Sequence, residues 1–187
     1  MEGLYLALLS ITNPGDEYII PAPYYVNYGQ MVHMCGGVPV IVDKPAEEPL
    51  TFRIEDIESA ITPKTKAIII NTPSNPSGKI IPWNKIEKLA ELAKKHDLYV
   101  ISDEVYKCLI YGENKFKSIV SIEGMRERTI LTNSLSKEFC MTGWRIGYVL
   151  ANKEIVANMT KLQENVCACA PLPSQYAAIE ALSSKED

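Results

Sequence analysis

The chain has 187 residues, 47% of them hydrophobic, which is enough for one domain with a sizeable core. Its formal charge is −4, from 19 basic and 23 acidic residues, and no run of Lys and Arg is long enough to predict a nucleic-acid-binding face. Five cysteines form an odd set without the spacing of a disulfide framework, which predicts reduced thiols and a cytoplasmic location.

The first predicted element is a buried helix over residues 2–11, because apolar side chains surround this segment instead of forming one stripe. The segment has no basic leader and is too short to span a bilayer, so we expect neither a signal peptide nor a membrane partner. Because the chain begins inside a core helix, we expect it to be part of a longer protein.

Strands and helices alternate along the rest of the chain. Apolar runs predict strands at residues 17–21, 38–42, 67–71, 99–102, 129–132 and 145–150. Helical spacing predicts helices at residues 53–61, 82–95, 153–163 and 174–182, and residues 44–49 are predicted to be a polar surface loop. This order predicts an α/β fold, with a three-layer, wound and mostly parallel sheet.

In an open sheet of this kind, ligands bind beyond the carboxyl ends of the strands. The unusual polar residues of this chain follow directly after predicted strands. They are Tyr24 and Tyr25, the segment 71–78, Asp103 and Tyr106, and Ser134 and Lys137. If the last strand runs antiparallel to the others, Arg145 at its start lies at the same edge. We therefore expect a single site there.

Lys137 is the most informative of these residues. It stands between small hydroxyl residues and the largely apolar segment 139–141. Burial would disfavour its ammonium form, and a nearby cation such as Arg145 would add to this effect, leaving a nucleophilic amine that can condense with an aldehyde. The aldehyde that we expect is pyridoxal 5′-phosphate (PLP).

Other polar residues suit further parts of PLP. A buried carboxylate such as Asp103 could keep the pyridine nitrogen protonated, although a helix N-cap or a surface acid explains that residue alone equally well. Asn75 and Tyr106 could donate hydrogen bonds to the phenolate oxygen, although the segment around Asn75 is also a common turn. Tyr25 could stack on the ring, or could simply pack near its flanking prolines.

The phosphate group of PLP carries about two negative charges and calls for a cation and hydroxyl groups. Arg145 with Ser134 could fill that role, since an arginine at the start of an apolar strand is otherwise hard to explain. Cys167 and Cys169 could bind a metal, but no second Cys or His pair completes four ligands, so we expect no metal site.

Three sequence blocks resemble, in order and spacing, the class I/II aminotransferases of PLP fold type I, the aspartate aminotransferase type. The blocks are residues 71–78 (NTPSNPSG), 102–106 (SDEVY) and 134–147, which contain SLSK and TGWRIG. The resemblance implies that Lys137 forms the aldimine with PLP and transfers protons. It also implies Asp103 at the pyridine nitrogen, Asn75 and Tyr106 at the phenolate oxygen, Tyr25 on the ring, Ser134 and Arg145 at the phosphate, and Tyr25 and Asn75 near the substrate carboxylate.

The same resemblance implies an aminotransferase that moves an amino group between an amino acid and a 2-oxo acid, and a homodimer for the intact protein. It implies that residues 1–187 are most of the PLP-binding large domain, without the N-terminal arm, a phosphate-binding Gly/Ser/Thr segment and the C-terminal small domain. We expect this part alone to have low or no activity. A PLP-dependent lyase of the same fold and a non-catalytic fragment remain alternatives, whereas a Rossmann module is disfavoured because no Gly-x-Gly-x-x-Gly occurs.

Overall fold

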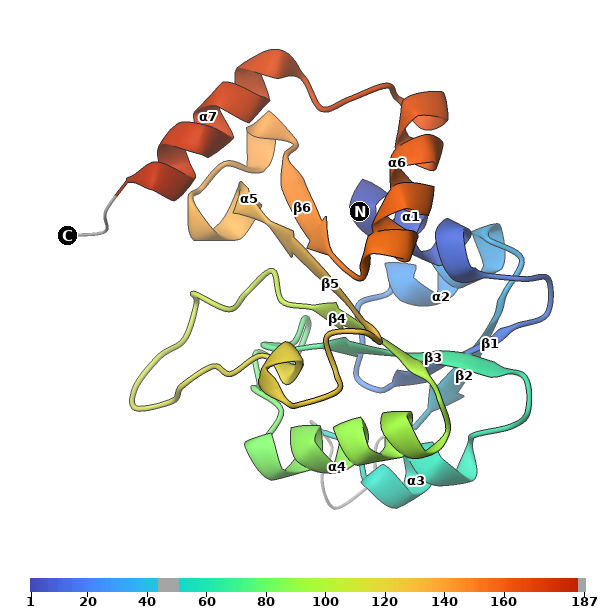
Figure 1. Cartoon of the computed structure of the whole chain (residues 1–187). Helices are drawn as coiled ribbons and strands as arrows, with labels where there is room; N and C mark the ends of the chain where they lie inside the picture. The colour runs from blue at the N-terminus through green and yellow to red at the C-terminus, as the bar shows by residue number, and fades with distance from the viewer. Residues whose placement is uncertain (44–50, 185–187) are drawn as a thin grey trace.

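The structure, a computed structural model, describes residues 1–43 and 51–184 and is built around a six-stranded sheet (Figure 1). The strands are β1 (Glu17–Pro21), β2 (Val38–Val42), β3 (Thr65–Asn71), β4 (Tyr99–Asp103), β5 (Thr129–Ser134) and β6 (Gly147–Leu150). Their order is β2-β1-β3-β4-β5-β6, with β6 antiparallel to β5 and every other pair parallel. The mostly parallel sheet predicted from the sequence is confirmed, while the predicted loop at 44–49 lies outside the described residues.

Helices cover both faces of the sheet, so the three predicted layers are present (Figure 1). One face carries α1 (Glu2–Ile11), α2 (Asn27–Met34) and α6 (Lys153–Val166), and the other carries α3 (Ile54–Ser59), α4 (Trp83–Lys95) and the 3-10 turn η1 (Ile119–Ser121). The turn η2 (Thr142–Trp144) and the helices α5 (Leu135–Glu138) and α7 (Leu172–Ser183) lie at the β6 side of the sheet. In the described ranges, no helix is long and apolar enough to cross a membrane.

The apolar run in β3 shows why both faces need a cover. Ile68, Ile69 and Ile70 are all buried, and alternate side chains of a strand point to opposite faces. Ile69 belongs to the core under α1 and α2, whereas Ile68 and Ile70 belong to the core under α4. A continuous apolar strand is typical of a parallel sheet covered on both sides.

The structure corrects the predicted start of the last strand. β6 begins at Gly147 and not at Arg145, because residues 142–144 form η2 and Arg145 then adopts a left-handed backbone with φ 51° and ψ 47°. β6 does run antiparallel to β5, with Ser134 paired to Gly147, so the condition for placing Arg145 at this edge is met. Arg145 therefore lies in the turn before β6, close to the carboxyl end of β5.

Candidate active site

The carboxyl ends of the central strands meet at one edge of the sheet. Across that edge, Asn71 of β3 is paired with Asp103 of β4, and Asp103 with Thr132 of β5. An open pocket of about 940 Å³ lies there. All seven residues predicted for the site line this pocket: Tyr25, Asn75, Asp103, Tyr106, Ser134, Lys137 and Arg145.

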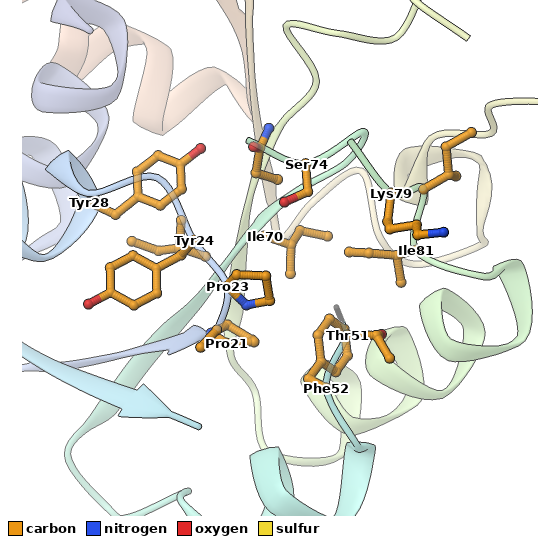
Figure 2. Close-up of a pocket in the computed structure, with 14 residues that line it drawn as sticks. Pro21, Pro23, Tyr24, Tyr28, Thr51, Phe52, Ile70, Ser74, Lys79 and Ile81 are labelled. Carbon is orange, nitrogen blue, oxygen red and sulfur yellow. The ribbon is translucent and has the colours of Figure 1, made fainter. Parts of the chain in front are cut away.

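A second pocket of about 40 Å³ adjoins the first, and Figure 2 shows its lining. Tyr28 and Asn71 line both pockets, and the small pocket is otherwise mostly apolar, with Phe52, Ile70 and Ile81 in its wall. Its volume gives room for only about one to three water molecules. The larger pocket is therefore the one in which a cofactor and a substrate can meet.

Asp103, the last residue of β4, holds its carboxylate through two hydrogen bonds. The Tyr28 hydroxyl donates to Oδ2 at 2.7 Å, and the backbone N–H of Val105 donates to Oδ1 at 3.2 Å. Burial raises the pKa of Asp103, while these two hydrogen bonds act in the opposite direction. A carboxylate withdrawn from water in this way gains most from a cationic partner in the pocket.

Asn71 and Asn75 fix the loop that follows β3 next to Asp103. The Asn71 side chain donates from Nδ2 to the Asp103 carbonyl oxygen at 2.9 Å, and its Oδ1 accepts from the Asn75 backbone N–H at 2.7 Å. The loop after β3 is thereby fixed against the end of β4. The pKa of Tyr106 is raised, mainly by burial and then by the charge of Asp103, while the Asn75 side chain acts in the opposite direction. Tyr106 therefore keeps its proton and can act as a hydrogen-bond donor.

Tyr25 lies just before α2 and its ring is held from two sides. The Tyr28 ring forms a T-shaped pair with it, with centroids 5.6 Å apart and an interplanar angle of 78°. The Asn27 side chain donates from Nδ2 to the Tyr25 hydroxyl at 3.1 Å. An aromatic ring fixed in this way can offer one face to a planar ligand.

Lys137 lies in α5, a helix of four residues whose N-cap is Ser134, with the Ser134 hydroxyl accepting from the Ser136 backbone N–H at 3.2 Å. Its side chain is exposed to the open pocket, so the expectation of a buried lysine is wrong for this structure. The physical reason is that so short a helix, at the side of the sheet next to β6, leaves the amine without a cover. Its Nζ lies 6.0 Å from the centre of the Tyr106 ring, within reach of a molecule in the pocket.

A small polar network joins the residues that follow Tyr106 and Lys137 in the chain. Lys107 Nζ donates to the Tyr148 hydroxyl at 3.3 Å and lies 3.8 Å from Glu138 Oε2. Burial lowers the pKa of Lys107, but Tyr148 and Glu138 together outweigh it and raise that pKa. The network ties the segment after β4 to α5, and so connects the positions of Tyr106 and Lys137.

Arg145 completes the pocket edge next to Ser134. Its side chain is exposed, and Nη1 donates to the Thr142 carbonyl oxygen at 2.7 Å. Ser136 and Thr142 line the same part of the pocket. A guanidinium group beside several hydroxyl groups suits an anion such as a phosphate group.

Cys167 and Cys169, considered as metal ligands, lie between α6 and α7. Cys167 Sγ lies 2.6 Å from Glu2 Oε1 and 2.8 Å from Gln163 Nε2. Over residues 1–43 and 51–184, no group of three or more His, Cys, Asp or Glu side chains could hold a metal ion.

Sequence reasoning missed two residues that organise the site, Tyr28 and the side chain of Asn71. Tyr28 follows Tyr25 by three positions, a spacing that could have suggested a shared helical face, but α2 was not predicted. Asn71 was recognised only as the start of a motif. Both side chains contact Asp103, which is distant in the chain, so the contacts with Asp103 do not follow from a local pattern.

Comparison with known proteins agrees with this arrangement. The family model of aminotransferase class I and II matches residues 2–187. The aspartate aminotransferase of Bacillus sp. strain YM-2 is 42% identical over 98% of this chain and 47% of its own length. The structure of the aromatic aminotransferase from Pyrococcus horikoshii OT3 has a TM-score of 0.95 at 39% identity, over 98% of this chain and 49% of that one.

A third protein, the aspartate aminotransferase from Rhizobium meliloti, has a TM-score of 0.96 at 34% identity, over 100% of this chain and 47% of that one. The chain thus spans about half the length of the relatives that it matches. The match with the family model covers nearly all of its residues. The chain belongs to the class I and II aminotransferases.

Proposed function

We propose that the intact protein is a PLP-dependent aminotransferase that moves an amino group between an amino acid and a 2-oxo acid. The observation that supports this most directly is the gathering, in one pocket, of an accessible amine, a carboxylate held away from water and an arginine beside hydroxyl groups. These side chains come from two separate sequence blocks, residues 102–106 and 134–147. When bound, PLP supplies a reactive carbonyl carbon and an electron-withdrawing ring, which is chemistry that protein side chains lack.

The residues present fit this cofactor group by group. Lys137 would hold it covalently, and the Asp103 carboxylate, kept from water, would favour a protonated pyridine nitrogen. Asn75 and Tyr106 would donate hydrogen bonds to the phenolate oxygen, and Tyr25 would stack on the ring. In the same proposal, Ser134 and Arg145 would bind the phosphate, and Tyr25 and Asn75 would lie close to the substrate carboxylate.

The part of the reaction that falls to this chain is proton transfer and positioning. The Lys137 amine would act as the base that moves a proton from the substrate α-carbon. Hydrogen bonds from Tyr28 and Val105 fix the Asp103 carboxylate, and the Asn71 side chain fixes the Asn75 backbone. Because these contacts exist before any ligand arrives, Asp103 and Asn75 would hold the cofactor in place while charge shifts. Lys107 and Glu138 would keep the segments that carry Tyr106 and Lys137 in register with each other.

The chain itself corresponds, in this proposal, to most of the PLP-binding large domain of such an enzyme. The relatives are named for different substrates, aspartate in one case and aromatic amino acids in another, so the proposal extends to amino acids and 2-oxo acids as classes. We propose weak PLP binding and poor or no transamination by residues 1–187 alone. Turnover at the level of a full-length relative, dependent on an added 2-oxo acid, would contradict that part; turnover without one would indicate a lyase.

We also propose a homodimer for the intact protein and a cytoplasmic location. The dimer is supported by the large apolar side chains on the outer side of α7, such as Leu172 and Ile179. The location is supported by thiols that are not joined in disulfides: Cys35, Cys140, Cys167 and Cys169.

The assignment of Lys137 is tested by reducing the PLP-loaded chain with borohydride and mapping the labelled peptide. We expect the label on the peptide that contains Lys137, and no label in Lys137→Ala. Lys88→Ala is the matched control, because Lys88 is an exposed lysine of α4 that does not line the pocket. A label on another side chain, or one that persists in Lys137→Ala, would show that the assignment is wrong.

A further inference from the structure

Tyr28 is a buried residue of α2 that touches two parts of the proposed site at once. Only 2% of its surface is exposed, and its hydroxyl bonds to Asp103, 75 residues away in the chain. Figure 2 shows its ring above the small pocket, with the hydroxyl turned away from Pro21 and Phe52. Its position between the two pockets leaves its hydroxyl facing the carboxylate and its ring facing Tyr25.

The direction of the hydrogen bond between Tyr28 and Asp103 is fixed by chemistry. Burial, followed by the charge of Asp103, raises the pKa of Tyr28 well above its ordinary value of 10.0. The phenol therefore keeps its proton and can only donate to the carboxylate, at 2.7 Å. Since the Val105 N–H donates to the other oxygen, each carboxylate oxygen has one protein donor and keeps acceptor capacity for a ligand.

The ring of Tyr28 makes the second contact. The rings of Tyr28 and Tyr25 form a T-shaped pair, with centroids 5.6 Å apart and an interplanar angle of 78°, an arrangement that favours one orientation of the Tyr25 ring. One rigid side chain thus sets both the carboxylate and the aromatic ring. Neither function requires contact between Tyr28 and the cofactor.

We infer that Tyr28 is a positioning residue, whose hydroxyl keeps Asp103 ionised and aimed into the pocket and whose ring orients Tyr25. The inference rests on the proposed PLP site for its role in cofactor binding. The contact with Asp103 can be tested without the cofactor, so the two ideas can fail separately.

The first test is an NMR titration of the Asp103 carboxyl carbon in the cofactor-free chain. Tyr28→Phe should make Asp103 titrate at a higher pH than in the wild type, because a donor to the ionised form is lost. The other ionisable groups that act on Asp103, or respond to it, are the Met1 amino group, Glu104 and Tyr106, and they are the same in all variants. An unchanged titration in Tyr28→Phe would overturn the inference.

Tyr18→Phe is the matched control. Tyr18 is a fully buried tyrosine of β1 whose hydroxyl makes a bond of the same length, 2.7 Å, to Thr12, and it does not line the site. Both variants should therefore lose similar stability, but only Tyr28→Phe should move the Asp103 titration. If Tyr28→Phe does not fold, the contact can be tested in the wild type through the Cζ resonance of Tyr28. This resonance should shift with the titration of Asp103, and a resonance that does not shift would overturn the inference.

The second test is the dissociation constant for PLP. We expect Tyr28→Phe to weaken binding by about tenfold, the order expected for a hydrogen bond to a charged group, with little change in Tyr18→Phe. In an Asp103→Asn background, the same substitution should add little, since its charged partner is gone. If the losses of PLP affinity caused by Tyr28→Phe and Asp103→Asn simply add, Tyr28 has a structural role only. If even the wild type shows no PLP binding, the proposed weak binding by residues 1–187 alone is wrong, and the titration of Asp103 alone tests the role of Tyr28.

Discussion

At the scale of single residues, the site holds two adjacent acids, of which Asp103 is partly buried and Glu104 is fully buried. Asp103 faces the pocket, while Glu104 is buried and its Oε1 accepts from Ser102 Oγ at 2.9 Å and Ser118 Oγ at 2.6 Å. Burial raises the pKa of both carboxyl groups. For Glu104 the hydroxyl donors fix the segment before η1, whereas Asp103 has part of its capacity left for a ligand. Loss of the charge of Glu104 would therefore affect contacts within the fold, whereas loss of the charge of Asp103 would affect the binding of a ligand.

We expect Asp103→Asn to stabilise the cofactor-free chain near neutral pH while it weakens PLP binding. The folded pKa of Asp103 lies above its ordinary value of 3.8, so the folded chain holds this proton more tightly than the unfolded chain does. The stability that the group contributes is present below 3.8 and is lost as the pH rises through the folded pKa. Replacing the Asp103 carboxyl group by a neutral amide should raise the free energy of unfolding by about 1 kcal/mol near neutral pH. Below pH 3.8, the ordinary pKa of the group, the substitution should leave the free energy of unfolding unchanged.

Urea unfolding of the two chains across this pH range measures the difference. Asp56→Asn serves as a surface control, because the ion pair of Asp56 with Arg53 is exposed and should contribute less than about 1 kcal/mol. A loss of stability in Asp103→Asn near neutral pH would contradict the expected sign. In that case the hydrogen bonds from Tyr28 and Val105 would outweigh the cost of burial.

At the scale of elements, strong local sequence patterns correctly predicted the sheet and the long helices. Two short helices with weak patterns, α2 and α5, were not predicted. The apolar run of β3 and the amphipathic α4 carry their own signals. The helices α2 and α5 have eight and four residues, too few to show a period, and depend on contacts from elsewhere in the chain. The last strand was predicted too long because an apolar run does not reveal the left-handed backbone of Arg145.

The start of β6 depends on a residue without a side chain. A Cβ at Gly147 would lie 2.5 Å from the Asn133 carbonyl oxygen, so Gly147→Ala must push β6 away from the end of β5. We expect a loss of about 1 to 3 kcal/mol in the free energy of unfolding. Because Gly147 pairs with Ser134, we also expect weaker PLP binding.

The matched control is Gly143→Ala, in which the added methyl group meets nothing within 4 Å. It should leave the free energy of unfolding unchanged or slightly higher, since alanine reduces the freedom of the unfolded chain. Urea unfolding and the dissociation constant for PLP measure both effects. Equal stability of the two variants would show that β6 can shift without cost.

At the scale of the whole molecule, the sequence predicted which strand ends form the site but not how its side chains hold one another. All seven predicted residues reached one pocket because the parallel strands bring their carboxyl ends together and the antiparallel β6 begins at the same edge. The bond from Tyr28 to Asp103 spans 75 residues and has no local signal. The expected burial of Lys137 failed for the same reason, since exposure is decided by the packing of the whole chain.

The outer side of α7 is the clearest feature at this scale that is not covered by other parts of the described residues. The helix buries small residues, Ser174 and Ala178, and exposes its largest apolar side chains. The exposed side chains are Leu172, Tyr176, Ile179 and Leu182, each between 58% and 66% exposed. Their spacing places them along one side of the helix, the reverse of the pattern of a helix in contact with water.

We expect this face to drive association of the chain with itself, and Ile179→Glu to reduce that association. A charge at the centre of an apolar contact is costly to bury, whereas the exposed position of Ile179 means that folding itself should change little. Tyr111→Glu is the control, because it adds the same charge at a side chain that is 79% exposed and lies far from α7 in the chain. Sedimentation over a range of concentrations should show weaker association in Ile179→Glu only, with similar melting temperatures for both variants. A wild-type chain that stays monomeric at every concentration, or a control that dissociates equally, would contradict a role for α7 and leave the proposed dimer without its structural support.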